Sequence, residues 1–344
     1  MPEASLKRST SSEAAPSRTD QLNYREAVNA ALFRACRDWP EVLIYGEDVA
    51  RPGGVFGVTK GLRDAFGDRV FDTPISESAI LGSAVGAALM GRRPIVEIMW
   101  ADFSLVALDQ LVNQAANVRY VSRGRLAAPM VVRTQQGTQH GACAQHSQSL
   151  EALFLHVPGL RLCMPATPQD AYDLLLSSVA CDDPVIFVEN RNLYVGGRSP
   201  VVLDGPVAGI GGGAVRRSGD ALTVVTWGAI LHKVLEAAEA LAAEGIDVEV
   251  VDARWLNPFD MPLVRRSVEH TGRLAVVHEA NRTGGFAAEV VAKVVESGIR
   301  LAAPPRRVAF PDTRVPAAPS LLDALLPTSV MISDELRALA ACRS

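Results

Sequence analysis

The chain has 344 residues, of which 48% are hydrophobic and 21% charged, so it is long enough for two domains with a large buried core. Its formal net charge is −4 and it has no block of basic residues, which argues against nucleic acid as a partner. Gly, Arg or His interrupts each apolar run before the roughly 18 residues that a membrane span needs, so no membrane partner is expected.

The cysteines point to a reducing compartment. There are five of them, an odd number without a CxxC pair, which is typical of neither a disulfide framework nor a zinc site. We therefore expect a cytoplasmic location and no metal centre built on cysteine. Residues 1–20 are rich in Ser, Thr, Pro and Ala and lack the apolar core of a signal peptide, so we expect a disordered tail there.

After this tail, apolar residues recur at helical spacing over residues 22–38, and Trp39-Pro40 ends the helix. Short apolar strands and helices then alternate along the chain. The predicted strands are residues 41–46, 69–74, 92–100, 128–134 and 184–190, and the further helices are residues 78–90, 108–122 and 167–183. Strands alternating with helices predict an α/β fold with a doubly wound, mostly parallel sheet, in a first domain of residues 21–196.

The glycine-rich residues 197–220 interrupt this alternation, and we assign them to a linker and hairpin. The pattern then restarts in a smaller C-terminal α/β domain, residues 221–344, which ends in a predicted helix. Its predicted strands are residues 221–228, 247–254 and 273–280, and its predicted helices are residues 229–245 and 285–298.

Polar residues follow several predicted strands, which is where open α/β sheets place their sites. Glu47 follows "VLIYG", Glu77 follows "RVFDTPIS", and His140 and His146 lie in "QQGTQHGACAQHSQS", the loop after "MVVRT". Residues 100–103 add aromatic rings at the end of "PIVEIM". Acids, aromatic rings and histidines on one sheet edge indicate proton-transfer chemistry on a planar ligand.

Each of these residues also has a purely structural explanation. A carboxylate such as Glu77 at a helix N-terminus is stabilised by the helix dipole by roughly 0.3–1 kcal/mol. His146 fits a loop histidine bonded to backbone, and Phe103 by itself is a typical core residue. His140 is equally open. Residue type and spacing alone leave these alternatives standing.

The chain contains, in this order, "YGEDVARPGGVFGVTKGL", "FGDRVFDTPISESAILGSAVGAAL", "RPIVEIMWADF", "AQHSQSLEALF", "DDPVIFVEN" and "VVHEANRTGGFAAEV". These segments resemble the β subunit of the thiamine-diphosphate-dependent decarboxylating component of 2-oxoacid dehydrogenase complexes, in the transketolase-like superfamily. Pyruvate, branched-chain 2-oxoacid and acetoin dehydrogenases share that subunit. The resemblance covers roughly residues 23–327 and implies a pyrimidine-binding domain followed by a transketolase-like C-terminal domain. It also implies oxidative decarboxylation of a 2-oxo acid with acyl transfer to lipoamide.

The resemblance implies roles for four residues. The glutamate of the "PISE" motif, here Glu77, would be catalytic and cofactor-binding, because in the family it exchanges a proton with the pyrimidine nitrogen of thiamine diphosphate. Phe103 matches the aromatic residue that stacks on the pyrimidine. His146 matches the catalytic histidine on the substrate side. Glu47 matches an acid near the cofactor, in a water-filled tunnel that connects two active sites.

A partner is implied as well. Thiamine enzymes hold Mg²⁺ and the diphosphate with a GDG motif and a downstream Asn, and no GDG occurs in this sequence. The family solution is a separate α subunit that holds Mg²⁺, in an α2β2 heterotetramer that serves a lipoyl acyltransferase core. Transketolase, which carries both halves in one chain, is disfavoured by this absence.

The turn "SSVACDD" resembles a family site in which backbone carbonyls, here those of Ser178, Val179 and Cys181, hold a potassium ion. The 2-oxo acid itself is not specified by the sequence. Alternatives are an acetoin-cleaving dehydrogenase, a two-subunit biosynthetic thiamine-diphosphate transferase with another acceptor, and a non-catalytic scaffold.

Overall fold

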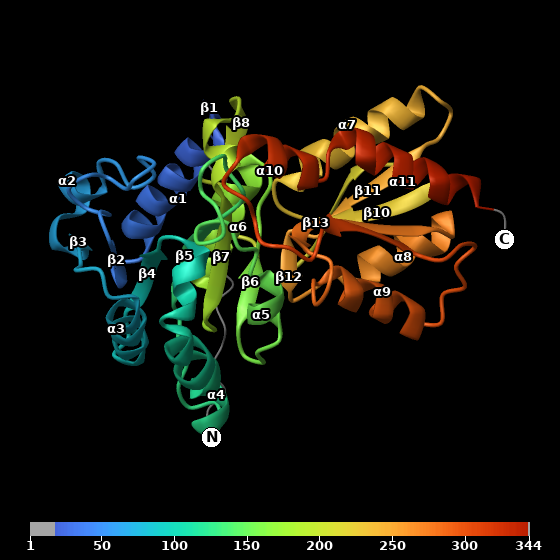
Figure 1. Ribbon diagram of the computed structural model, residues 1–344. Coiled ribbons are helices and arrows are strands. Elements are labelled where there is room, and N and C mark those ends of the chain that lie inside the picture. Colours follow the sequence, from blue (N-terminus) through green and yellow to red (C-terminus); the bar gives the residue numbers. More distant parts are fainter. Residues whose placement is uncertain (1–17, 343–344) are drawn as a thin grey trace, which may run out of the picture.

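The computed structural model describes residues 18–342 and folds them into two α/β domains that lie side by side (Figure 1). The predicted tail, residues 1–20, falls mostly outside the described residues. Strand β1 (Thr19–Leu22) begins inside it, so the last residues assigned to the tail belong to a strand. Among the described residues, no helix combines the length and the apolar character that crossing a membrane requires.

The first domain is built on a seven-stranded sheet with the order β12-β6-β7-β5-β4-β2-β3. The strands are β2 (Val42–Gly46), β3 (Val70–Asp72), β4 (Arg93–Ile98), β5 (Val131–Gln136), β6 (Arg161–Cys163), β7 (Val185–Asn190) and β12 (Trp255–Asn257). All neighbouring pairs are parallel except β12 with β6. Every residue of β5 and β7 is buried, as expected for parallel strands covered on both faces. The predicted mostly parallel, doubly wound sheet is confirmed.

Helices cover both faces of this sheet. Helix α1 (Tyr24–Asp38) packs on α6 (Pro168–Ala180) on one side, and α3 (Glu77–Leu89) lies on the other. Local chemistry sets where α1 begins, because Asn23 and Glu26 form a reciprocal capping box at its N-terminus. Thr167 caps α6, because its side-chain oxygen accepts a hydrogen bond from the backbone N–H of Asp170. These helices were predicted from apolar spacing.

The predicted helix 108–122 is not one regular α-helix. It divides into the π-helical turn η3 (Gln110–Gln114), the 3₁₀ turn η4 (Ala115–Asn117) and the short helix α4 (Val118–Val121). The Asn117 side chain donates hydrogen bonds to the backbone carbonyls of Asn113 and Val112, at 3.2 and 3.4 Å. Because the Asn113 carbonyl would otherwise accept the regular i to i+4 bond, this side chain competes with the α-helical pattern.

The second domain has a five-stranded sheet with the order β14-β13-β10-β11-β9, parallel except for β9. Its strands are β9 (Ala214–Arg217), β10 (Leu222–Thr226), β11 (Val248–Asp252), β13 (Leu274–Asn281) and β14 (Arg306–Phe310). Helices α7 (Ile230–Ala242) and α11 (Ser329–Ala341) cover one face, and α8 (Met261–Thr271) and α9 (Ala287–Glu296) cover the other (Figure 1). The short helix α10 (Pro319–Leu325) precedes α11.

The region predicted as a linker and hairpin contains two strands that do not pair with each other. Strand β8 (Ser199–Val202) pairs with β1, and β9 joins the second sheet beside β11. In the other direction, β12 lies between β11 and α8 in the chain but pairs with β6 of the first sheet. The boundaries predicted from the sequence therefore differ from those of the two sheets. Strand β9 of the predicted linker belongs to the second sheet, and β12 of the predicted C-terminal domain belongs to the first.

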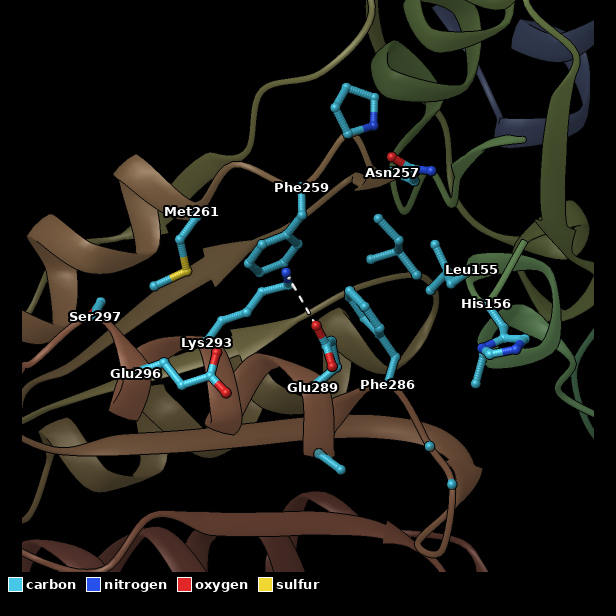
Figure 2. Close-up of a pocket in the computed structure, with 16 residues that line it drawn as sticks. Leu155, His156, Asn257, Phe259, Met261, Phe286, Glu289, Lys293, Glu296 and Ser297 are labelled. Carbon is cyan, nitrogen blue, oxygen red and sulfur yellow. Dashed lines mark ion pairs between the residues drawn. The ribbon is translucent and has the colours of Figure 1, made fainter. Parts of the chain in front are cut away.

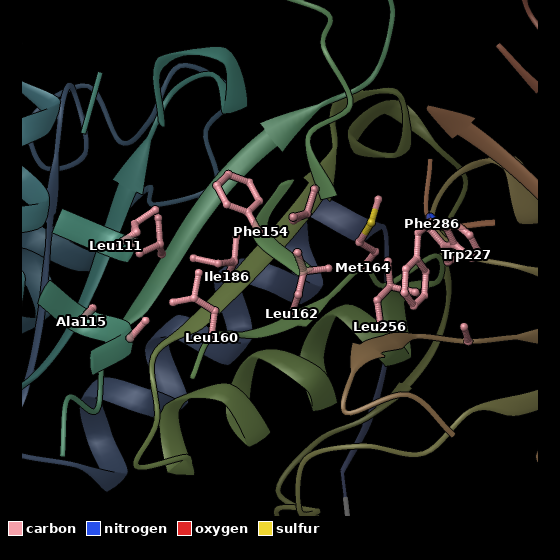
Figure 3. Packing of buried hydrophobic residues seen from close by; sticks show 14 of the residues in the cluster. Leu111, Ala115, Phe154, Leu160, Leu162, Met164, Ile186, Trp227, Leu256 and Phe286 are labelled. Carbon is pink, nitrogen blue, oxygen red and sulfur yellow. The ribbon is translucent and has the colours of Figure 1, made fainter. Parts of the chain in front are cut away.

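Apolar packing continues from one domain into the other. One buried cluster runs from Leu111 and Ile186 in the first domain to Trp227 and Phe286 in the second (Figure 3). This continuous apolar contact holds the two sheets against each other.

A buried ion group joins the three central strands of the first sheet. Arg133 on β5 is fully buried and pairs with Glu97 on β4 at 2.5 Å and with Glu189 on β7 at 2.7 Å. The Tyr194 hydroxyl donates to the other oxygen of Glu189 at 2.7 Å. Burial raises the pKa of Glu189, while the positive charge of Arg133 opposes that rise. One arginine is therefore the shared positive partner of two acidic side chains inside the sheet.

Replacing Arg133 should expose this dependence. We expect Arg133→Met to lower the free energy of unfolding by about 3–5 kcal/mol at pH 7, because two buried carboxylates lose their partner. The difference from the parent should shrink as the pH falls, because burial raises the pKa of Glu189 and protonation of its carboxyl removes an unpaired charge. Urea denaturation measures both. As a control, Arg265→Met breaks an exposed pair with Glu269 and should cost at most about 0.5 kcal/mol; equal effects of the two changes would contradict the argument.

A second pair of acids lies at the contact between the domains. Glu151, the first residue of α5 (Glu151–Leu155), accepts from Trp227 Nε1 of the second domain at 3.4 Å. Glu279 on β13 accepts from Asn190 Nδ2 of the first domain at 2.7 Å. Burial raises the pKa of Glu279 to about 7; Lys233 opposes this, and the charge of Glu151 adds to it. Burial also raises the pKa of Glu151.

The raised pKa of Glu279 predicts a pH-dependent stability. The folded state binds its proton more tightly than the unfolded state does, so this stability is present below the unfolded pKa and is lost as the pH rises through about 7. In Glu279→Gln, the side-chain amide oxygen can still accept the hydrogen bond from Asn190, but the side chain no longer titrates. We expect it to match the parent near pH 4 and to be more stable at pH 8 in thermal unfolding. If the stabilities of parent and variant change in parallel with pH, this prediction is wrong. Glu236→Gln, on the exposed face of α7, is the control and should follow the parent at every pH.

Candidate functional site

Four residues singled out from the sequence follow four neighbouring parallel strands. Glu47 follows β2, Glu77 begins α3 after β3, Phe103 lies in the 3₁₀ segment η2 (Ala101–Leu105) after β4, and His146 lies in the loop after β5. The spatial order of these strands is β5-β4-β2-β3. Because the carboxyl ends of parallel strands meet at one edge, the four residues lie along the same edge of the sheet.

Glu77 and Glu47 are close enough to influence each other. Burial raises the pKa of Glu47, and the negative charges of Glu77, Asp48 and Glu97 raise it further. Glu77 is half-buried and its carboxylate has no hydrogen-bond partner among the described residues. The N-cap of α3 is Ser76, whose side chain makes no capping bond. The carboxylate of Glu77 is therefore free to bind a ligand.

His146 lies in a corner made by two aromatic rings. Its ring centroid is 5.5 Å from that of Phe103 and 6.2 Å from that of Trp100, and both rings meet it edge to face. The Ser78 hydroxyl donates to the carbonyl of Val106 at 2.9 Å, which ties the first turn of α3 to the segment after Phe103. The acid pair and the aromatic corner thus sit on adjoining, connected elements.

Sequence reasoning missed several polar residues at this edge. Asp102 is 7% exposed and accepts from Gln148 Nε2 at 2.9 Å, and its other oxygen, Oδ2, is buried without a partner among the described residues. Arg191 is 3% exposed; its guanidinium lies 4.8 Å from the centre of the Trp100 ring and donates to the Ser147 hydroxyl at 3.3 Å. The available signal was a charged residue inside or beside an apolar strand, as in "MWADF".

His140, the other loop histidine, is exposed and pairs with Asp323 of α10 at 2.9 Å. It faces the C-terminal segment, whereas His146 meets the aromatic rings of η2 and its neighbour Trp100. The two histidines therefore have different surroundings, and only His146 belongs to the aromatic corner.

The carbonyls expected to hold a monovalent cation already meet a positive charge of the protein. Arg93 Nη1 donates to the carbonyls of Val179 and Cys181 at 2.8 and 3.1 Å, and the carbonyl of Ser178 accepts from the N–H of Cys181 at 3.3 Å. Arg93 Nη2 also pairs with Asp182 at 2.6 Å. This arrangement does not fit an additional cation, and no functional step is assigned to one.

A large cleft lies elsewhere, between α5, the segment from β12 to α8, and α9 (Figure 2). Its volume is about 890 Å³, and Leu155, Phe259 and Phe286 line it together with the ion pair of Glu289 and Lys293 at 3.1 Å. None of the four candidate residues lines it. This cleft is therefore separate from the sheet edge that carries the candidate residues.

Comparison with known families matches most of the chain. Residues 20–196 match the family described as transketolase, pyrimidine binding domain, and residues 211–332 match transketolase, C-terminal domain. A solved structure titled split gene transketolase, inactive beta4 tetramer, superposes with a TM-score of 0.77 at 22% identity, covering 94% of this chain and 100% of that one. At that identity the superposition shows the fold alone, and the expected transketolase-like α/β fold is confirmed.

Curated relatives are more similar. The chain is 42% identical over 329 residues to the acetoin:2,6-dichlorophenolindophenol oxidoreductase subunit beta of Cupriavidus necator, covering 92% of this chain and 97% of the relative. It is 41% identical over 298 residues to the pyruvate dehydrogenase E1 component subunit beta of Bacillus subtilis, covering 86% and 92%. It is 42% identical over 303 residues to the 3-methyl-2-oxobutanoate dehydrogenase subunit beta of Mycobacterium tuberculosis, covering 87% of each. The resemblance carried by the sequence motifs is thus confirmed: the chain belongs to the family of 2-oxoacid and acetoin dehydrogenase β subunits.

Proposed function

We propose that this chain, with an α subunit, forms a thiamine-diphosphate-dependent component that oxidatively decarboxylates a 2-oxo acid and passes the acyl group to lipoamide. The observation that carries the proposal is the sheet edge with Glu77 beside Glu47 and Phe103 against His146, in a chain of this family. Pyruvate and branched-chain 2-oxo acids are the candidate substrates.

The residues at this edge suit the pyrimidine end of thiamine diphosphate. Once bound, that cofactor supplies an electron sink for breaking the carbon–carbon bond next to a carbonyl. The free carboxyl group of Glu77 would hold the proton exchanged with the pyrimidine nitrogen. Phe103 offers an aromatic ring for stacking on the pyrimidine. Glu47, whose pKa is raised, would share protons with Glu77.

His146 has the position and chemistry for proton transfer on the substrate side. Its imidazole is half-buried and held by two ring edges, so it would present a ring nitrogen in a defined direction. In that role it donates or accepts a proton as the acyl group forms and leaves.

A partner chain would complete the site. The sequence has no GDG motif, and the described residues contain no group of three or more His, Cys, Asp or Glu side chains placed to hold a metal ion. Apolar side chains near Glu77 are open to solvent, with Ile75 80% exposed and Val106 61% exposed. An α subunit that covers this surface and holds Mg²⁺ and the diphosphate would explain both features. We propose the α2β2 assembly, working with a lipoyl acyltransferase core, with residues 21–196 as the pyrimidine-binding domain.

Acetoin cleavage is the second candidate. The relative from Cupriavidus necator named for acetoin is matched over 97% of its length. Acetoin lacks the carboxylate of a 2-oxo acid, so the two substrates would need different polar contacts on the side of His146.

Glu77→Gln tests the central assignment. With the α partner and thiamine diphosphate present, we expect this variant to fold and to bind the partner but to lose at least about 100-fold in turnover, because the amide cannot exchange the proton. Steady-state assay and gel filtration measure the two properties. Glu236→Gln, far along α7, should leave both unchanged. Turnover within a few-fold of the parent would refute the role of Glu77.

The partner requirement gives a separate prediction. The purified chain alone should turn over neither pyruvate, nor branched-chain 2-oxo acids, nor acetoin, and addition of a GDG-containing α subunit should produce turnover of one of them. Supplying lipoamide or 2,6-dichlorophenolindophenol as acceptor shows which one accepts the product. Thiamine-dependent turnover by the chain alone would contradict the divided site.

A further inference from the structure

The loop that carries His146 is held from outside its own domain. This loop, residues 137–150, joins β5 to α5. Its start is fixed by Gly137, whose φ is +106° and where a Cβ atom would lie 2.5 Å from the side-chain oxygen of Asn190. The rest of the loop extends toward residues 311–323 of the second domain, which we call the C-terminal strap.

The strap is fastened to the second domain before it reaches the loop. Asp312 accepts hydrogen bonds from the backbone N–H and the hydroxyl of Thr283, at 2.9 and 2.6 Å. Asn281 Nδ2 donates to the carbonyls of Pro311 and Thr313, at 2.7 and 3.2 Å. The position of the strap is therefore set by the end of β13 and the turn after it.

Three contacts then join the strap to the loop. Arg314 Nη1 donates to Gln148 Oε1 at 3.0 Å, the backbone N–H of Gly141 donates to the carbonyl of Ala317 at 3.3 Å, and His140 pairs with Asp323 at 2.9 Å. The Arg314 contact is the one nearest in sequence to His146. A cavity of about 110 Å³ lies beside these contacts, lined by residues of both the loop and the strap.

Gln148 also binds Asp102, the residue next to Phe103 of the aromatic corner. Its backbone N–H and its Nε2 both donate to Asp102 Oδ1, at 3.3 and 2.9 Å. Asp102 precedes Phe103, which meets the His146 ring at 5.5 Å. The amide of Gln148 is thus used at both ends: its oxygen accepts from Arg314 and its nitrogen donates to Asp102.

From this geometry we infer that Arg314, Gln148 and Asp102 form a positioning relay, by which the C-terminal domain sets the orientation of His146 against Phe103. The three are positioning residues and none is assigned contact with substrate. The inference rests on the proposed function of His146. It makes the second domain a part of the catalytic apparatus, because an arginine on the strap completes the support of a histidine in the first domain.

The test uses Arg314→Ala in the full chain assembled with its α partner. We expect kcat to fall about ten-fold with KM within about two-fold, since a small misplacement of a catalytic group costs rate more than binding. The limb of the pH–rate profile that His146→Asn removes should be displaced in Arg314→Ala. Arg314→Lys, which still donates to Gln148, should recover most of the lost rate. Arg306→Ala, on β14 and exposed, is the matched control and should resemble the parent.

Gln148→Glu separates the two ends of the relay. The new carboxylate still accepts from Arg314 but repels Asp102, so we expect it to be as slow as Arg314→Ala although the contact with the strap is kept. If Gln148→Glu instead matches the parent, the contact between Gln148 and Asp102 has no positioning role and the relay is wrong.

Hydrogen exchange keeps the relay separate from the proposed activity. In Arg314→Ala, amides of residues 137–150 should exchange faster than in the parent, with the same melting temperature and the same binding of the α subunit. An unchanged rate, pH profile and exchange pattern would overturn the relay, and so would a loss of rate accompanied by loss of folding or assembly. If the parent assembly itself has no turnover, the proposed function fails, and the exchange measurement alone still decides whether Arg314 holds the loop.

Discussion

The buried ion group of Arg133, Glu97 and Glu189 is the interaction on which the rest of the first domain depends. It lies in the three central strands β4, β5 and β7, whose ends lead to Phe103, to the His146 loop and to Asn190. Two acids in the interior of a sheet are tolerated only because one arginine serves both. The same group places Glu97 close enough to Glu47 to contribute to its raised pKa, so the charges inside the sheet extend to the candidate site.

The contact between the domains has a comparable role for the loop. Apolar packing from Ile186 to Trp227 fixes one sheet against the other, and hydrogen bonds then cross the same contact from Asn190 to Glu279 and from Trp227 to Glu151. Because the orientation is fixed, a side chain of the second domain can reach the loop with the precision that a hydrogen bond needs. A smaller or more polar contact would allow the domains to move apart.

The candidate site combines acidic and aromatic side chains at one edge of the sheet. It has carboxyl groups and aromatic rings suited to a flat, proton-exchanging ring system, and the described residues offer no cluster of metal ligands beside them. Next to Glu77 the surface is apolar and open to solvent, as the 80% exposure of Ile75 shows. Exposed apolar surface beside an acid fits a face that a partner covers. The large cleft near Phe259 and Phe286 is separate from this edge.

The sequence by itself determined the elements whose signal is local. Apolar spacing predicted α1 and α6, and alternating apolar runs predicted the parallel strands whose ends bring Glu47, Glu77, Phe103 and His146 to one edge. Tertiary structure alone decided the pairing of β12 with the first sheet and the hydrogen bonds from Arg93 to the Val179 and Cys181 carbonyls. It also decided the contact of Arg314 with Gln148. The reason is physical: periodicity and capping act between residues a few positions apart, whereas Arg314 and Gln148 are 166 positions apart and meet only because two packed domains place them there.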